Sequence, residues 1–156
     1  MLTAHLPAGY ILSRAVKRSG GGVTAAILLG SVLPDLDLIW FYLIDDRAIH
    51  HHRYWVHAPG FWAIATVPLL AVASRLDLMA LALGLLAAIF LHILLDSVAG
   101  GVMWHWPISD TLFQMIDVPA TRSHFILSFI FHWTFLLELA IWATALTLFT
   151  ASRRLT

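Results

Sequence analysis

The chain has 156 residues, of which 60% are hydrophobic and only 12% are charged, and its mean hydropathy is +0.85. This composition excludes an ordinary soluble domain and indicates an integral membrane protein. Nine Lys and Arg balance nine Asp and Glu, so no basic surplus is available for a phosphate backbone and we expect no nucleic-acid partner. The absence of cysteine leaves His and Asp as the ligands for any metal site.

The N-terminal third is predicted to form a broken helical hairpin. We expect antiparallel helices over residues 5–18 and 22–35, joined by a glycine run. Pro34 disfavours the α region for Leu33 and should interrupt the segment 23–44. The first residues show no basic segment followed by a cleavage site, so we expect no removable signal peptide.

Three later segments are long enough to span a bilayer. Residues 55–74 and 78–95 contain no Asp, Glu, Lys or Arg, and each can cross a hydrocarbon core of about 30 Å. After its first residue, segment 124–151 carries only His132 and Glu138 as ionisable groups, for which we expect bonds within the bundle. The predicted fold is all-α: one domain over the whole chain, a polytopic helical membrane bundle with three to four spanning segments.

Basic residues orient this bundle. Six fall on one side (Arg14, Lys17, Arg18, Arg75, Arg153 and Arg154) and three on the other (Arg47, Arg53 and Arg122). The positive-inside rule then places the first group in the cytoplasm and the loops 45–57 and 96–124 outside. We therefore expect a multi-pass inner-membrane protein whose loop face is extracytoplasmic.

Candidate metal ligands converge on that face although they are far apart in the sequence. The hairpin brings His5 level with Asp35, and helix 78–96 delivers His92 and Asp96 to the same end. The candidate ligands are His5, Asp35, Asp37, His52, His57, His92 and Asp96, with His51 and His105 as further candidates. Neutral imidazole and carboxylate together suit zinc, with manganese as the second choice.

Each motif also has a simpler structural interpretation. The i, i+4 spacing of His92 and Asp96 serves a hydrogen-bonded pair as well as a ligand pair. Asp35 and Asp37, if extended, would point the same way, and their apolar flanks favour a cation over an exposed acidic turn. The histidine run 50–52 is as typical of an exposed interface patch as of a metal site.

These residues suit metal-assisted hydrolysis. A divalent ion would lower the pKa of a bound water, and Asp35 or Asp37 would accept the proton. Arg53 has the planar fork that matches a phosphate, although it can instead pair with Asp45 or Asp46.

Aromatic residues suggest a substrate at the membrane surface. Trp55, Trp62, Trp104 and Trp106 are expected to form a belt at headgroup depth, and segment 103–119 is expected to cover the site. This arrangement favours membrane lipids as partners and a lipid or lipid-linked molecule as substrate.

The motifs resemble one known family when they are taken in order. They are His5 with Gly9, then Pro34 with Asp35 and Asp37, then His52, Arg53 and His57, and finally His92 and Asp96 with Gly101 and Pro107. Together they resemble the membrane-bound, metal-dependent hydrolases that are also called LexA-binding, inner-membrane-associated hydrolases. That family is distantly similar to zinc-dependent phospholipase C and nuclease enzymes, which implies clustered zinc and phosphoester hydrolysis. Ala58 and Ala99 depart from the family pattern, in which Ser and Thr are usual.

Three functions compete at this point. A lipid-directed hydrolase fits best. A non-catalytic structural or regulatory metal protein, as the LexA-binding label suggests, requires a metal site that its protein ligands close completely. A divalent-cation transporter ranks third, because the candidate ligands gather at one end and no acidic or His path crosses the membrane.

Overall fold

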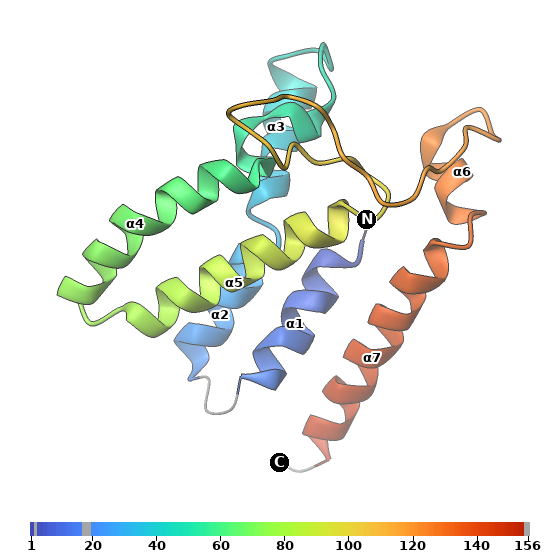
Figure 1. The fold of residues 1–156 in the computed structure, drawn as a ribbon. Coiled ribbons are helices and arrows are strands. Elements are labelled where there is room, and N and C mark those ends of the chain that lie inside the picture. The colour runs from blue at the N-terminus through green and yellow to red at the C-terminus, as the bar shows by residue number, and fades with distance from the viewer. Residues whose placement is uncertain (2, 17–19, 155–156) are drawn as a thin grey trace.

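The computed structural model describes residues 1, 3–16 and 20–154, and the elements of this part are helical (Figure 1). The α-helices are α1 (His5–Ala15), α2 (Gly21–Gly30), α3 (Asp37–Leu43), α4 (Pro59–Arg75), α5 (Met79–Asp96), α6 (Phe125–Ile130) and α7 (Phe135–Arg153). Short 3-10 turns are η1 (Pro34–Leu36), η2 (His51–Arg53) and η3 (Trp55–His57). Among the described residues the only β pairing is an isolated bridge between Val102 and Phe113. The all-α class is confirmed.

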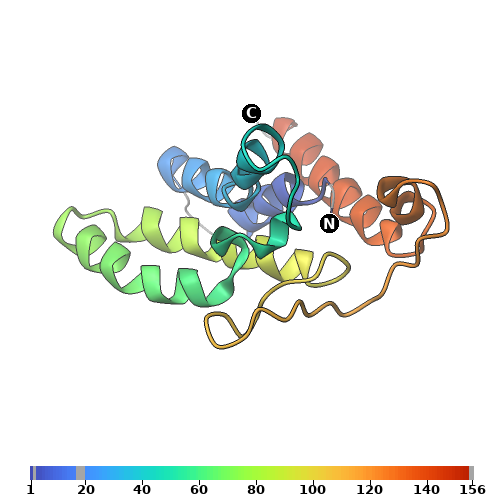
Figure 2. The same cartoon turned by 90° about the horizontal axis from the view of Figure 1, so that it is seen from above.

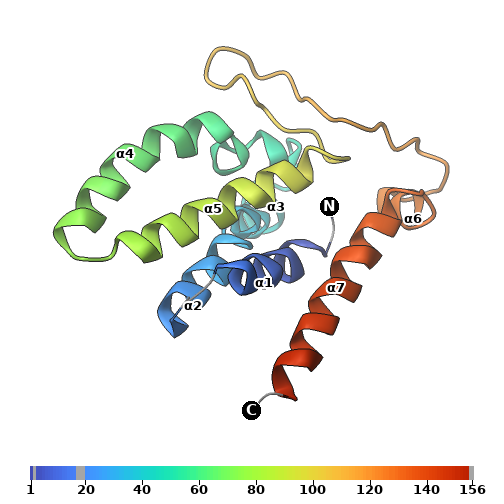
Figure 3. The same cartoon turned by 60° about the horizontal axis from the view of Figure 1, so that its bottom comes forward.

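Helix α5 lies at the centre of the bundle. It packs against α1, α2 and α4, whereas α7 contacts α1 and stands at the edge (Figures 1 and 3). A Cβ at Gly30 of α2 would lie 2.4 Å from the carbonyl oxygen of Leu85, so α2 and α5 approach more closely than any side chain there would permit. Ile89 and Ile93 of α5 pack with Val102 into a fully buried core.

Within the described part of the chain, two helices are long and apolar enough to cross a membrane, namely α5 and α7. The consecutive helical segments Gly21–Gly30 and Pro34–Leu43, bent by 54° at their junction, add a third if they form one broken span. The predicted span 55–74 is different, because its helix α4 begins at Pro59 and is 17 residues long with Pro68 inside. Trp55–His57 form the separate turn η3, since Ala58 before Pro59 is extended.

The interruption at Pro34 is present, but its backbone is helical instead of extended. Leu33 keeps α values (φ −58°, ψ −42°), so the expected bias away from this region is wrong here. Asp37 is also helical (φ −65°, ψ −20°). Pro34 occupies the first position of η1, where its missing N–H costs no hydrogen bond. The two carboxylates therefore do not share one face, as they would on a strand.

The C-terminal apolar segment is divided between α6 and α7, and the turn between them spans 131–134. Arg14, Arg75 and Arg153 lie in the last turns of α1, α4 and α7. Those turns are at the end of the bundle away from the N-terminus (Figure 1). Lys17, Arg18 and Ser19, where the first helix was predicted to end, lie outside the described residues.

A long irregular segment joins α5 to α6 (Figure 2). Its backbone is tied back to the end of α5, since the amides of Met115 and Ile116 donate to the carbonyls of Ser97 and Val98. At residue 114 it borders a small hollow beside the η2 histidines. The predicted covering segment 103–119 therefore lies against the end of the bundle that holds the site.

Candidate metal centre

Eight imidazole and carboxylate side chains meet at the end of the bundle near the N-terminus. This His/Asp cluster consists of His5 of α1, Asp35 of η1, Asp37 of α3, His51 and His52 of η2, His57 of η3, and His92 and Asp96 of α5. The structure thus brings together all seven predicted metal ligands and one of the two further candidates. The other, His105, is exposed and belongs to none of the groups that could hold an ion.

Nε2 of His57, Nε2 of His92 and Oδ2 of Asp96 lie at the centre of the cluster, and Oδ1 of Asp35 lies beside the two rings. Oδ1 of Asp35 lies 3.7 Å from Nε2 of both His57 and His92. Oδ2 of Asp96 lies 3.0 Å from Nε2 of His92 and 3.8 Å from Nε2 of His57. Tetrahedral zinc with ligands at about 2.0–2.2 Å requires ligand atoms about 3.2–3.6 Å apart, so these spacings fit with small adjustments.

The outward nitrogen of each central ring is held by a hydrogen bond. Nδ1 of His57 donates to Oδ2 of Asp37 at 2.7 Å, and Nδ1 of His92 donates to the carbonyl of Ser31 at 2.8 Å. Nδ1 of His52 faces the carbonyls of Gly100 and Gly101 at 2.9 and 2.8 Å. In a neutral ring these bonds leave the lone pair on Nε2, which is the arrangement of metal-ligating histidines.

Buried polar atoms in the centre have no hydrogen-bond partner. They include Nε2 of His57, Nε2 of His92 and Oδ2 of Asp96, and these three side chains are at most 1% exposed. An unpartnered buried polar atom costs about 1–3 kcal/mol and a buried carboxylate more. A divalent cation would satisfy all three atoms at once, so the residues present fit a metal.

Asp35 and Asp37 lie at opposite nitrogens of the His57 ring. Asp35 faces Nε2 of His57, whereas Asp37 accepts from Nδ1. This division follows from the helical backbone of the Pro34–Asp37 segment and was not foreseen in the sequence. It places Asp35 among the inward ligand atoms and gives Asp37 the position of an orienting carboxylate.

His5 joins the cluster from the side. Its ring stacks on that of His92 with centroids 3.7 Å apart, and its Nε2 lies 3.1 Å from Oδ1 of Asp96. Glu138 of α7 accepts hydrogen bonds from the backbone amide and hydroxyl of Thr3, which ties down the segment before His5. Nδ1 of His132 bonds to the hydroxyl of Thr134, so both ionisable groups of the last segment bond within the bundle, as expected.

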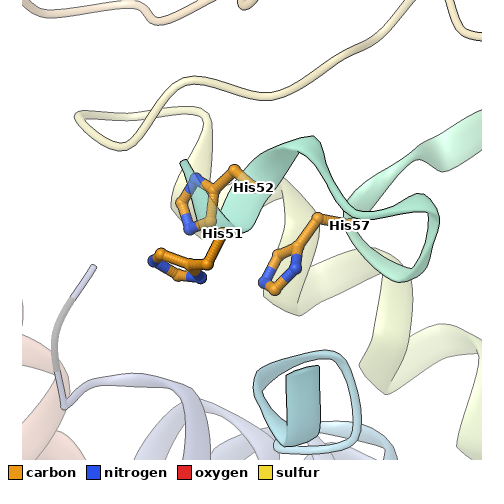
Figure 4. A group of neighbouring side chains, drawn as sticks. All are labelled: His51, His52 and His57. Carbon is orange, nitrogen blue, oxygen red and sulfur yellow. The ribbon is translucent and has the colours of Figure 1, made fainter. Parts of the chain in front are cut away.

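The histidine turns bring three rings to one side of the chain (Figure 4). The rings of His51 and His52 lie 4.2 Å apart, and those of His52 and His57 lie 4.6 Å apart and stacked. Gly100 makes this packing possible, because a Cβ there would lie 2.5 Å from Cε1 of His52. The run 50–52 is therefore part of the cluster at His51 and His52, while His50 is exposed.

Electrostatics differ between neighbouring histidines. Burial lowers the pKa of His52 to about 3, so this ring is neutral. Burial also lowers the pKa of His57, but the neighbouring carboxylates of Asp35 and Asp37 outweigh it and raise the pKa to about 9. A cation at Nε2 of His57 would take the place of that proton.

Arg53 pairs with a residue that the sequence did not suggest. Its Nη1 lies 3.2 Å from Oδ2 of Asp110 on the exposed surface. Asp45, one of the expected partners, instead accepts a hydrogen bond from the hydroxyl of Tyr54. Sequence reasoning also missed the orienting carbonyls of Ser31 and Gly100, since backbone acceptors leave no signature beyond the nearby glycines.

Buried imidazoles and carboxylates at one end of an apolar helical bundle define a membrane protein with a candidate metal centre. The chain matches the model of the YdjM inner membrane protein family over residues 1–155, and it belongs to that family. The family description confirms the inner-membrane part of the resemblance drawn from the motifs. No curated protein and no solved structure matches the chain significantly.

Proposed function

We propose that this inner-membrane protein is a metal-dependent hydrolase that cleaves a phosphoester in a lipid or lipid-linked substrate. One observation carries the proposal: the buried ligand atoms of His57, His92 and Asp96 lie close together without a hydrogen-bond partner, and three protein ligands leave the fourth position of a zinc ion open for water. Zinc suits this donor set best, and manganese is the second choice.

The chain's own groups have distinct roles in this proposal. A divalent cation supplies Lewis-acid activation of water and of phosphoryl oxygens. Asp35, whose side chain is 29% exposed, is the carboxylate that water can reach, and it accepts the proton. Asp37 fixes the ring of His57. Arg53 exchanges its exposed partner Asp110 for the substrate phosphate, because such surface pairs contribute only about 0–1 kcal/mol.

The proposed protein is multi-pass, with the cluster on the extracytoplasmic side. The six-to-three division of basic residues supports this orientation, since the last turns of α1, α4 and α7 carry arginines. Cysteine labelling tests it cleanly because the chain has no native Cys. An impermeant thiol reagent on intact cells should label Ser109→Cys and spare Ser74→Cys, and the reverse pattern would invert the orientation.

A non-catalytic structural or regulatory metal protein is the second candidate. Ala58 and Ala99 favour it. Both are buried and lie close in the sequence to His57 and Asp96 of the cluster, at positions where the family that the motifs resemble has Ser and Thr. Without those hydroxyls, fewer hydrogen bonds are available to hold ligands or substrate in a reactive position.

Hydrolysis by tag-free, metal-replete protein tests the proposal. The substrates are a phospholipid, a lipid phosphate and a generic phosphodiester. Asp96→Asn should lose metal and turnover together, whereas Asp77→Asn, in the turn between α4 and α5, should keep both. If the wild-type protein turns over none of the three, the hydrolase proposal fails and the non-catalytic candidate replaces it.

A further inference from the structure

We propose that a large apolar cavity of the protein is the binding site for a hydrocarbon chain of the substrate lipid. The cavity measures about 800 Å³ and lies between η1, α3, η3 and the start of α4. Its walls include Leu36, Trp40, Trp55, Phe61 and Trp62. The role in substrate binding rests on the proposed hydrolase function, while chain binding itself is tested separately.

The chemistry of the walls matches a hydrocarbon. Asp37 is the only charged residue among those that line the cavity. Polar groups of the wall are used internally, since Nε1 of Trp62 donates to the carbonyl of Val56 and the hydroxyl of Tyr54 donates to Asp45. The volume falls within the range of about 300–1,000 Å³ that ligand sites show.

The cavity borders the metal centre at Asp37. This residue lines the cavity and also accepts the hydrogen bond from His57 at 2.7 Å. A smaller hollow of about 140 Å³ lies beside the cluster, and its walls include His51, His52 and Gln114. The cluster thus stands between the apolar cavity and a smaller hollow that is lined in part by imidazole and amide groups. A lipid with its chain in the cavity would have its head group beside the cluster.

The side from which a lipid chain would enter the cavity faces apolar surroundings. Trp40 and Trp55 are each 54% exposed, and the cavity is bounded by α3 of the candidate broken span. In an inner-membrane protein such aromatic surface meets lipid chains and headgroups. An acyl or prenyl chain can therefore enter from the bilayer and bring its phosphate to Asp35 and His57.

Photo-crosslinking in vesicles tests whether the cavity binds a lipid chain. The probe is a phosphatidylcholine with a diazirine in one acyl chain, added to the full chain with metal and again after chelation. We expect labelling concentrated on residues 36–62 in both states, because apolar walls bind the chain. Trp40→Ala with Trp55→Ala should weaken labelling about tenfold, and Phe at both positions should restore it.

The control is Trp133→Ala, which removes an equally exposed tryptophan between α6 and α7 and should leave labelling unchanged. Wild-type metal affinity in every variant shows that the fold is intact. Labelling that simply follows exposed apolar surface, with α7 labelled as strongly as the cavity, would overturn the proposed binding of a lipid chain in the cavity. Equal kcat/KM for lipid and soluble phosphodiesters would also overturn chain binding in the cavity, but it would leave the hydrolase proposal intact. Labelling of the cavity without any turnover supports chain binding in the cavity and rejects the hydrolase proposal.

Discussion

Replacing Asp37 by Asn tests whether this carboxylate orients a metal ligand. Its Oδ2 accepts the Nδ1 proton of His57 at 2.7 Å, and the side chain is only 6% exposed. Asn keeps an oxygen acceptor of the same shape but removes the charge. A hydrogen bond to a charged group contributes about 1.5–3 kcal/mol and a neutral one about 0.5–1.5 kcal/mol. The difference, about 1–1.5 kcal/mol, predicts roughly tenfold weaker metal binding.

Competition with a chromophoric zinc chelator measures this affinity in detergent micelles, on protein purified without a His-tag. Asp37→Asn should bind the same number of ions per chain as the wild type, only more weakly. Asp45→Asn is the matched control, because Asp45 accepts from Tyr54 and not from a cluster histidine. Unchanged affinity would refute the orienting role. Loss of an ion per chain would show instead that Asp37 is a direct ligand.

Other substitutions probe the surroundings of the cluster. Gly100→Ala should weaken metal binding, because its Cβ would collide with the ring of His52; Gly21→Ala, with open space around it, should not, and the same chelator titration compares them. Arg53→Lys should keep metal content and lower kcat/KM for phosphoester substrates, since the fork is lost while the charge remains. Gly30→Ala should destabilise the fold by about 1–3 kcal/mol by pushing α2 from α5, which would appear as a lower thermal midpoint in detergent.

Composition and spacing were sufficient for the all-α class and for the convergence of the ligands. His92 and Asp96 could be paired because the i, i+4 spacing fixes them on one helical face. The location of His5 followed from connecting two short helices, and in the structure His5 stacks on His92. Membrane topology thus limits where distant polar residues can meet.

The local backbone geometry could not be predicted from the sequence in the same way. The pre-proline rule predicted an extended Leu33, but the turn η1 starts at Pro34 and keeps Leu33 helical. The roles of Asp35 and Asp37 depend on that geometry, because it sends them to opposite nitrogens of His57. The partner of Arg53 lies 57 residues away in an irregular loop, where no periodic pattern constrains the contact. The single domain, the span count and the orientation stay predictions.

Metal content and ligation test the central claim most directly. Elemental analysis of tag-free protein, combined with X-ray absorption at the zinc edge, should find at least about one ion per chain with nitrogen and oxygen ligands from imidazole and carboxylate. His92→Ala with Asp96→Ala should remove that ion and destabilise the protein, because two buried side chains are lost and the remaining ligand His57 is left without its cation. Protein that stays free of zinc and manganese after supplementation, with the same metal content in the double variant, would contradict the account.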